Sequence, residues 1–262
     1  MKQSKRWRCI ESGINAPEWN MAVDEALLMS FREGDLPILR LYGWERSLSA
    51  GRFSKIHSRV NLEKLKECRI SCVRRISGGG ILVHGGDLSY ALILPRESLR
   101  SHGVKESYRI LCAFLIRLYE KLGFKADFAC DSNVATAHSD ICLAANEAYD
   151  IMIEGRKSGG NAQRYFRKVL FQHGSIPITL ESETWDPIFL EDSGVEEAAT
   201  LERLGRNVSY EELSESLKEA FCETFAVTLT IDALTPLEEE RAKVLLADKY
   251  TQDRWNFDGK SV

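Results

Sequence analysis

The stretch VRRISGGGILVHGGD, residues 73–87, gives the clearest indication of fold and function in this chain. Arg74 and Arg75 follow a short apolar run, and Ser77 with three glycines separates them from a second apolar run. This order predicts a strand, a glycine-rich loop and another strand. Successive glycines let the backbone approach a ligand closely, and the arginines add charge-assisted hydrogen bonds to a carboxylate or phosphate. The alternative is a tight hairpin turn beside a salt-bridged strand end.

A second glycine-containing stretch, GRKSGGNAQ, spans residues 155–163. Lys157 stands there between Arg156 and a pair of glycines. A lysine at this position can place a point charge on an anion, or act as an amine of lowered pKa if it is partly desolvated. A solvated turn lysine is the competing interpretation.

The composition describes an ordinary globular protein. The chain has 262 residues, 44% hydrophobic and 28% charged, with a formal net charge of −4. This charge argues against a general nucleic-acid binder, whose phosphate contacts demand a basic surface. No secretory signal and no apolar run of membrane-spanning length is present in the sequence. We therefore expect a cytoplasmic protein with one domain over residues 1–262, whose more helical part, about 182–262, packs on the same core.

Cysteine and histidine show no metal-ligand or disulfide pattern. The seven cysteines are odd in number and include no C-x-x-C pair, which predicts free thiols. The five histidines show no ligand spacing, and no structural zinc site is expected. By local sequence alone Cys142 is a small core residue. His84 and His173 are each flanked by glycine, so either could contact a ligand, although a histidine bonded to backbone is the commoner outcome.

Periodicity and capping signals place the elements. We predict helices at 17–33, 60–68, 104–122, 210–224 and 236–249, and strands at 38–42, 70–76, 87–94 and 226–231. Residues 47–53 are predicted to pair with 38–42, and the apolar strand 87–94 to be covered on both faces. Capping boxes at Ser209 and Thr235 open the last two helices. Three acidic residues are interpreted as helix-cap or loop carboxylates and three aromatic ones as core: Asp24, Glu25 and Asp87; Trp44, Phe53 and Tyr90.

Taken together, the two glycine stretches resemble the lipoate–protein ligase and octanoyltransferase family. The matching residues are Arg74, Arg75, Ser77, Gly78, Gly79, Gly80, His84, Asp87, Leu88 and Tyr90, then Gly155, Arg156, Lys157, Gly160, Asn161, Ala162 and Gln163, and finally Gln172, His173, Gly174 and Ser175. Further matches at Asn20, Asp24, Arg40, Trp44 and Trp255 extend the resemblance over essentially the whole chain. It implies an α+β fold like the biotin protein ligase catalytic domain, a mostly antiparallel mixed sheet with outer helices. It also implies acyl transfer to a lysine of a lipoyl domain.

Two chemistries occur in this family. Ligases activate free lipoate with ATP, whereas transferases take octanoate from acyl carrier protein through a cysteine thioester. In the Gram-positive type of transferase, the catalytic cysteine opens a segment of the form Cys-Phe-x5-Tyr-Glu-x4-Gly-Arg-Lys. Cys142, Tyr149, Asp150 and Lys157 fall in this register, with Leu143 in place of Phe and Asp150 in place of Glu. The resemblance therefore implies Cys142 as nucleophile and Lys157 as its acid–base partner, and the lack of a small carboxy-terminal domain also favours a transferase.

The expected substrates follow from the resemblance. Octanoyl-acyl carrier protein is the expected donor. Lipoyl domains of the glycine cleavage H protein and of 2-oxoacid dehydrogenase E2 are the expected acceptors, with no nucleic acid and no membrane partner. The expected substrate-binding residues are Arg74, Arg75, Ser77, Gly78, Gly79, Gly80, His84, Gly160, Asn161 and Ala162. We expect a monomer without a cofactor or metal. Ligation is the alternative, because residues 74–80 and 51–53 also look ligase-like, and only it would use ATP and magnesium. Transfer of acyl groups between two lipoyl domains is a further variant.

Overall fold

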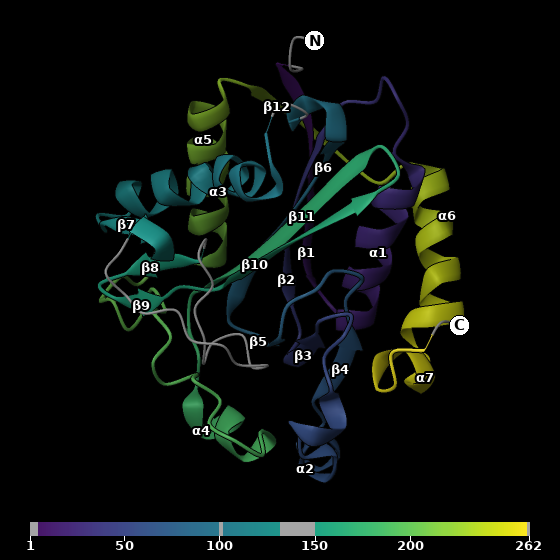
Figure 1. The fold of residues 1–262 in the computed structure, drawn as a ribbon, viewed down its shortest axis with the longest axis vertical. Helices are drawn as coiled ribbons and strands as arrows, with labels where there is room; N and C mark the ends of the chain where they lie inside the picture. Colours follow the sequence, from purple (N-terminus) through teal and green to yellow (C-terminus); the bar gives the residue numbers. More distant parts are fainter. Residues whose placement is uncertain (1–4, 100–101, 132–149, 261–262) are drawn as a thin grey trace.

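The computed structural model describes residues 5–99, 102–131 and 150–260. A mixed six-stranded sheet forms its centre, with strand order β10-β11-β6-β2-β1-β12 (Figure 1). The strands are β1 Arg6–Asn15, β2 Ile38–Trp44, β6 Asp87–Pro95, β10 Gly160–Phe166, β11 Val169–Pro177 and β12 Thr228–Asp232. The β2–β6, β6–β11 and β11–β10 pairs are antiparallel, and β1 is parallel to both β2 and β12. The α+β prediction is confirmed.

Helices cover both faces of this sheet. On one face α3 (Val104–Lys121) packs with α5 (Tyr210–Phe225), and on the other α1 (Pro17–Ser30) packs with α6 (Pro236–Leu245). Strand β6 serves both layers: alternate residues such as Leu92 join the α3–α5 core, and the intervening Ile93 joins the α1 core. This confirms the prediction of a strand buried on both faces, since successive side chains point to opposite sides.

Two three-stranded sheets complete the fold. The first has the order β4-β3-β5 and consists of β3 Ser47–Ala50, β4 Ser71–Arg74 and β5 Ile81–His84. The second has the order β7-β8-β9 and consists of β7 Ala126–Phe128, β8 Ile151–Ile153 and β9 Arg156–Lys157. Short helices α2 (Leu62–Glu67), α4 (Ser182–Trp185) and α7 (Asp253–Asn256) lie at the periphery (Figure 1).

Local signals predicted where the helices begin, whereas α1 and α6 end at Ser30 and Leu245, three and four residues before the predicted ends. Both capping boxes form, at Ser209 with Glu212 and at Thr235 with Glu238.

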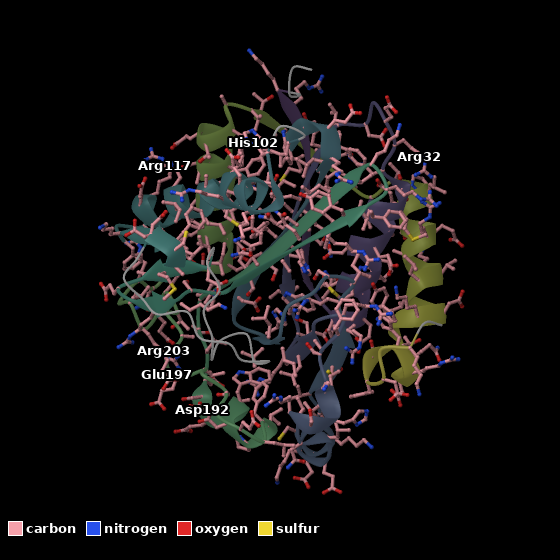
Figure 2. The ribbon with its side chains drawn as sticks, in the orientation of Figure 1. Arg32, His102, Arg117, Asp192, Glu197 and Arg203 are labelled. Atoms are coloured by element: carbon pink, nitrogen blue, oxygen red, sulfur yellow. The ribbon has the colours of Figure 1, made fainter. Side chains whose placement is uncertain are left out.

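Charged side chains such as Arg32 and Arg117 point outward at the edge of the molecule (Figure 2). No helix in the described part of the chain is long and apolar enough to cross a membrane.

The prediction for residues 47–53 was wrong. Strand β3 does not pair with β2; it lies between β4, to which it is parallel, and β5, to which it is antiparallel. The glycine loop consequently does not close a hairpin, because β4 and β5 are separated by β3. Phe53 was expected in the core but is 85% exposed. These outcomes depend on long-range pairing, which the alternation of a short apolar run does not encode.

Candidate functional site

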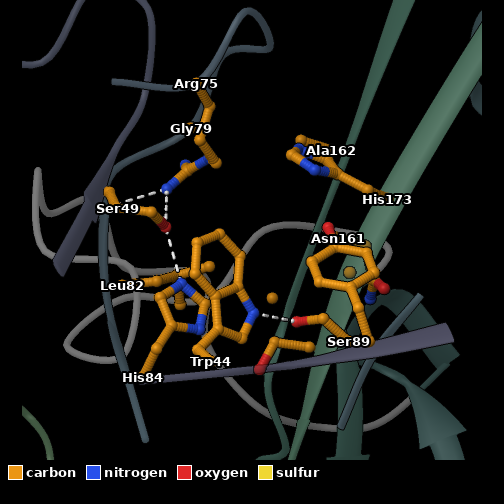
Figure 3. A pocket seen from close by; sticks show the side chains of 14 residues that line it. Trp44, Ser49, Arg75, Gly79, Leu82, His84, Ser89, Asn161, Ala162 and His173 are labelled. Carbon is orange, nitrogen blue, oxygen red and sulfur yellow. Dashed lines mark hydrogen bonds between the residues drawn. The ribbon is translucent and has the colours of Figure 1, made fainter. Parts of the chain in front are cut away.

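A small pocket with a cavity volume of about 30 Å³, partly open to solvent, lies where the glycine loop and the β3–β5 sheet meet the central sheet. Figure 3 shows Arg75, Ser49 and His84 on one side, with Asn161, Ala162 and His173 opposite them on β10 and β11. The lining residues are Tyr42, Trp44, Ser49, Arg75, Gly79, Leu82, His84, Ser89, Gly160, Asn161, Ala162, His173, Gly174 and Ser175. The structure thus brings together six of the residues predicted to bind substrate.

The glycine loop is fixed through its carbonyl groups. Arg75 Nη2 donates to the carbonyls of Gly78 (3.3 Å) and Gly80 (2.9 Å). Gly79, with φ of +92°, accepts from the Ser54 hydroxyl at 3.1 Å. A Cβ on Gly51 would lie 1.9 Å from the Gly79 carbonyl oxygen, so only glycine at position 51 allows this approach. Gly51 and Ser54 therefore contact the loop on one side, and on the pocket side Arg75 fixes it by hydrogen bonds to its carbonyl groups.

A directed chain of hydrogen bonds runs from Arg75 to a buried carboxylate. Arg75 Nη1 donates to Ser49 Oγ (2.8 Å), which lies 2.6 Å from His84 Nε2. His84 Nδ1 lies 2.8 Å from Asp87 Oδ2. Because the guanidinium can only donate, the Ser49 hydroxyl can donate to Nε2, and the Asp87 carboxylate accepts a hydrogen bond from Nδ1–H. This pattern assigns His84 the Nδ1–H tautomer. Trp44 stacks on the same imidazole with ring centroids 4.0 Å apart.

Asp87 is the hub that ends this chain. Its Oδ2 also accepts from the hydroxyls of Ser89 (3.1 Å) and Ser175 (2.7 Å), and its Oδ1 from the Gly85 N–H (3.1 Å). Burial alone would raise the pKa of this carboxyl. The adjacent His84 and the hydrogen bonds outweigh burial and hold the pKa of Asp87 below its ordinary value. Asp87 is thus an ionised anchor for His84.

A second serine–histidine–aspartate chain flanks the pocket from the β11 side. Ser77 Oγ, in the glycine loop, lies 2.5 Å from His173 Nε2. His173 Nδ1 lies 3.6 Å from Asp24 Oδ2, too far for a good hydrogen bond. Burial lowers the pKa of His173, although Asp24 opposes this shift. The ring is consequently neutral near neutral pH, and it ties the loop to the central sheet.

Asp24 already has a stronger partner. Arg40, whose side chain is fully buried, donates from Nη1 to Asp24 Oδ1 at 2.6 Å. Tyr42 donates its hydroxyl to Asp24 Oδ2 at 3.0 Å, and Asn20 accepts from Arg40 through its side-chain and backbone oxygens. Asp24 lies on α1 and Arg40 on β2, so this ion pair joins the helix layer to the sheet beneath the pocket.

Asn161 is oriented from the floor of the site. Tyr90 donates its hydroxyl to Asn161 Oδ1 at 2.7 Å, and Gln172 donates to the Tyr90 oxygen at 3.0 Å. A Cβ on Gly174 would lie 2.0 Å from Asn161 Oδ1. Glycine at that position therefore makes room for the oriented amide. Gly160 and Ala162, on either side in β10, also line the pocket.

Lys157 is buried on β9 and is not among the residues lining this pocket. Its Nζ lies 2.7 Å from Asp150 Oδ2, and both side chains are at most 6% exposed. The interpretation as a solvated turn lysine is wrong. Asp150 is the residue that stands for glutamate in the register around Cys142. Cys142 itself lies outside the described residues.

The Arg74 guanidinium donates hydrogen bonds to backbone carbonyl groups. These belong to Gly51, Arg52 and Ser54 on one side and to Trp255, Asn256 and Phe257 on the other. Arg74 does not line the pocket, and the structure gives it the role of joining the 51–54 segment to α7 and the residues after it. Within residues 5–99, 102–131 and 150–260, no group of three or more His, Cys, Asp or Glu side chains is placed to hold a metal ion.

Comparison with known proteins places this geometry in a family. A model of the lipoyl protein ligase A/B catalytic domain matches residues 16–222. The chain belongs to this family. It is 34% identical to the octanoyltransferase LipM of Kyrpidia tusciae, over 96% of this chain and 98% of the relative, and 32% identical to that of Bacillus subtilis, over 97% and 99%.

Solved structures show the same fold. A lipoate-protein ligase A bound with ATP superposes with a TM-score of 0.84 at 24% identity, covering 97% of this chain and all of the other. The Ta0514 protein of T. acidophilum, described as a putative lipoate protein ligase with bound lipoic acid, gives a TM-score of 0.84 at 25% identity over 97% of this chain and 99% of that one. The predicted family membership and fold are therefore confirmed.

Reasoning from the sequence missed part of the site. Asp24 and Asp87 were interpreted as cap or loop carboxylates, yet both are buried and face the two pocket histidines. Ser49 was not considered at all. A signal existed for Asp87, because it follows His84 by three residues across a Gly-Gly turn. Asp24 and His173 are far apart in sequence, and no local pattern predicts that they meet.

Proposed function

We propose that this protein is an octanoyltransferase that moves octanoate from a carrier-protein thioester to a lysine of a lipoyl domain. The observation that carries the proposal is the alignment of curated octanoyltransferases with nearly the whole chain at 32–34% identity. The register of Cys142, Asp150 and Lys157 supports the transferase chemistry. Lipoyl domains of the H protein and of 2-oxoacid dehydrogenase E2 are the proposed acceptors.

The first half-reaction forms an acyl-enzyme. The Cys142 thiolate attacks the octanoyl thioester carbonyl, the carrier leaves as a thiol, and Lys157 supplies the proton that this thiol takes up. The ion pair with Asp150 at 2.7 Å supports this role, because a lysine paired with a buried carboxylate is held in one place and enters the reaction charged.

The second half-reaction returns the enzyme to its starting state. The acceptor lysine amine attacks the Cys142 thioester, an amide forms and the Cys142 thiolate leaves. Lys157, which lost its proton in the first half-reaction, takes the proton that the amine loses. Charge balances over the cycle without a cofactor. The pocket between the two serine–histidine–aspartate chains is the proposed place for the octanoyl chain. Backbone N–H groups of the 155–162 stretch, which contains Lys157, or of residues 78–80 are the candidates that stabilise the oxyanion.

Lipoate ligation with ATP and magnesium is the second candidate. The braced loop at Arg75 and residues 77–80, and the likeness to a lipoate-bound structure at 25% identity, favour it. One assay separates the two candidates. Purified protein is incubated with an unmodified lipoyl domain and either octanoyl-carrier protein without ATP or free lipoate with ATP and magnesium.

The proposed function predicts modification of the lipoyl domain in the ATP-free reaction with octanoyl-carrier protein. Addition of a nucleotide-hydrolysing enzyme serves as control against carried-over ATP and leaves the result unchanged. Modification only with free lipoate and ATP contradicts the transferase and establishes the ligase.

A further inference from the structure

A second concave surface lies on the far side of the glycine loop from the pocket. It is a solvent-open groove of about 580 Å³ between the 52–58 segment and residues 257–260, which directly follow α7. It shares no lining residue with the pocket. Its wall is nevertheless bonded to the loop, because the Arg52 N–H donates to the Ser77 carbonyl at 2.7 Å and the Ser54 hydroxyl to the Gly79 carbonyl.

The groove is basic although the chain as a whole carries a net charge of −4. Arg52, Lys55 and Lys260 line it, with the buried Arg74 behind them. Asp258 is the one carboxylate among the described lining residues, and it lies 3.4 Å from both His57 and Lys260. A local field of opposite sign to the whole molecule attracts an acidic partner.

Two cations pack on the Trp255 ring next to the groove. Arg52 and Lys249 lie over the Trp255 ring, at 4.5 Å and 3.8 Å from its centroid. Burial, and the nearby Arg164 and Arg52, lower the pKa of Lys249 even though it pairs with Glu25. Glu25 compensates the charge of Lys249, so the positive charge that this cluster adds beside the groove comes from Arg52.

The groove also contains an apolar anchor. Phe53 is 85% exposed at its wall. An exposed aromatic ring among cations is typical of protein-binding surfaces, where aromatic residues supply buried contact area and rim charges steer the encounter.

We infer that this groove is the docking surface for the acidic carrier protein that donates the acyl group. The inference rests on the proposed function and names where its donor binds. A lipoyl domain must deliver its own lysine, whose stem is only four carbons long, and so has to sit over the pocket itself. A carrier protein presents its acyl group on a long flexible arm and can dock to one side of the loop.

Steady-state kinetics with two donors test this assignment. The donors are octanoyl-carrier protein and octanoyl-pantetheine, which carries the same thioester without the protein. The variant Lys55→Glu/Lys260→Glu reverses two exposed charges that are not part of the catalytic machinery, and Phe53→Ala removes the anchor. Lys105→Glu, an exposed charge reversal on α3 in the opposite helix layer, is the matched control.

The groove variants should raise KM for octanoyl-carrier protein about tenfold at low salt, with kcat unchanged. KM for octanoyl-pantetheine and for the lipoyl domain should stay at the wild-type value, and Lys105→Glu should change none of them. An unchanged KM for octanoyl-carrier protein overturns the inference, and so does a rise in KM for the lipoyl domain instead. A wild-type enzyme that transfers from neither donor contradicts the proposed function itself.

Discussion

Two serine–histidine–aspartate chains flank the pocket, and they differ in what the aspartate does. Asp87 receives four hydrogen bonds and holds His84 at 2.8 Å. Asp24 pairs with Arg40, whose Nη1 lies 2.6 Å from Asp24 Oδ1, and its other oxygen lies 3.6 Å from His173 Nδ1. The same three residue types therefore give an imidazole bonded closely to its carboxylate on one side, and on the other a neutral imidazole that is bonded to its serine but lies far from its carboxylate.

The difference shows that a residue triplet does not define a role without its further partners. The Asp24 carboxylate neutralises the fully buried Arg40 guanidinium, so its main contribution is to the stability of the fold. The Asp87 carboxylate orients the His84 ring, which lines the pocket, so its main contribution is to the geometry of the site. Neither serine is free to act as a simple nucleophile, since Ser49 accepts from Arg75 and Ser77 is fully buried.

The largest effect is expected for Asp24→Asn. It leaves the Arg40 guanidinium buried without a counter-ion, which typically costs about 3–5 kcal/mol of unfolding free energy. Urea denaturation measures the loss. The double variant Asp24→Asn/Arg40→Met removes both charges and should recover part of it. A loss of about 0–1 kcal/mol, as for a surface pair, would show that Asp24 does not have the role given to it here.

Asp87→Asn is expected to cost less stability and to affect the site more. Its buried donors lose part of their hydrogen bonding, worth about 1–3 kcal/mol, but no arginine loses its counter-ion. The amide no longer fixes the Nδ1–H tautomer of His84, so acyl transfer should fall more than with Ser175→Ala, which removes a single donor to the same carboxylate. Stability is read from urea denaturation and transfer from the lipoyl-domain assay. Equal transfer rates in the two variants would argue against a locked imidazole.

The smallest effect is a pH dependence carried by His173. Its folded pKa lies below the ordinary value of 6.5, so the unfolded state binds the proton first as pH falls. Stability should therefore decrease below pH 6.5, at about 1.4 kcal/mol per pH unit at most, until the folded pKa is reached. His173→Gln should flatten this part of the stability curve, as followed by thermal denaturation between pH 5 and 7. The same slope in the variant would assign the dependence to another group.

Much of the fold followed from local chemistry. The helix beginning at Pro17, the long helix Val104–Lys121 and both capping boxes are encoded by residues within a few positions of one another. The insertion of β3 between β4 and β5 depends on pairing with residues 24 positions away in β4 and 31 to 37 positions away in β5, and so it was mispredicted.

The site divides in the same way. Arg75, Gly79, His84 and the 160–162 stretch were predicted from motifs, and they do meet in one pocket. Arg74 stands next to Arg75 in the motif but does not line the pocket, and its guanidinium binds backbone carbonyls. Arg74 is the last residue of β4 and Arg75 follows the strand end, so the motif alone does not say which arginine lines the pocket.

The central claim is acyl transfer through one thiol, and intact mass spectrometry tests it most directly. The protein is mixed with octanoyl-carrier protein in the absence of ATP and of any acceptor, and its mass is read before and after hydroxylamine, which cleaves thioesters. We predict one octanoyl adduct that hydroxylamine removes, that Cys142→Ala abolishes, and that substitution of the exposed Cys68 by alanine leaves intact. An adduct of the same size on the Cys142→Ala protein, or no adduct on the wild-type protein, would contradict the account.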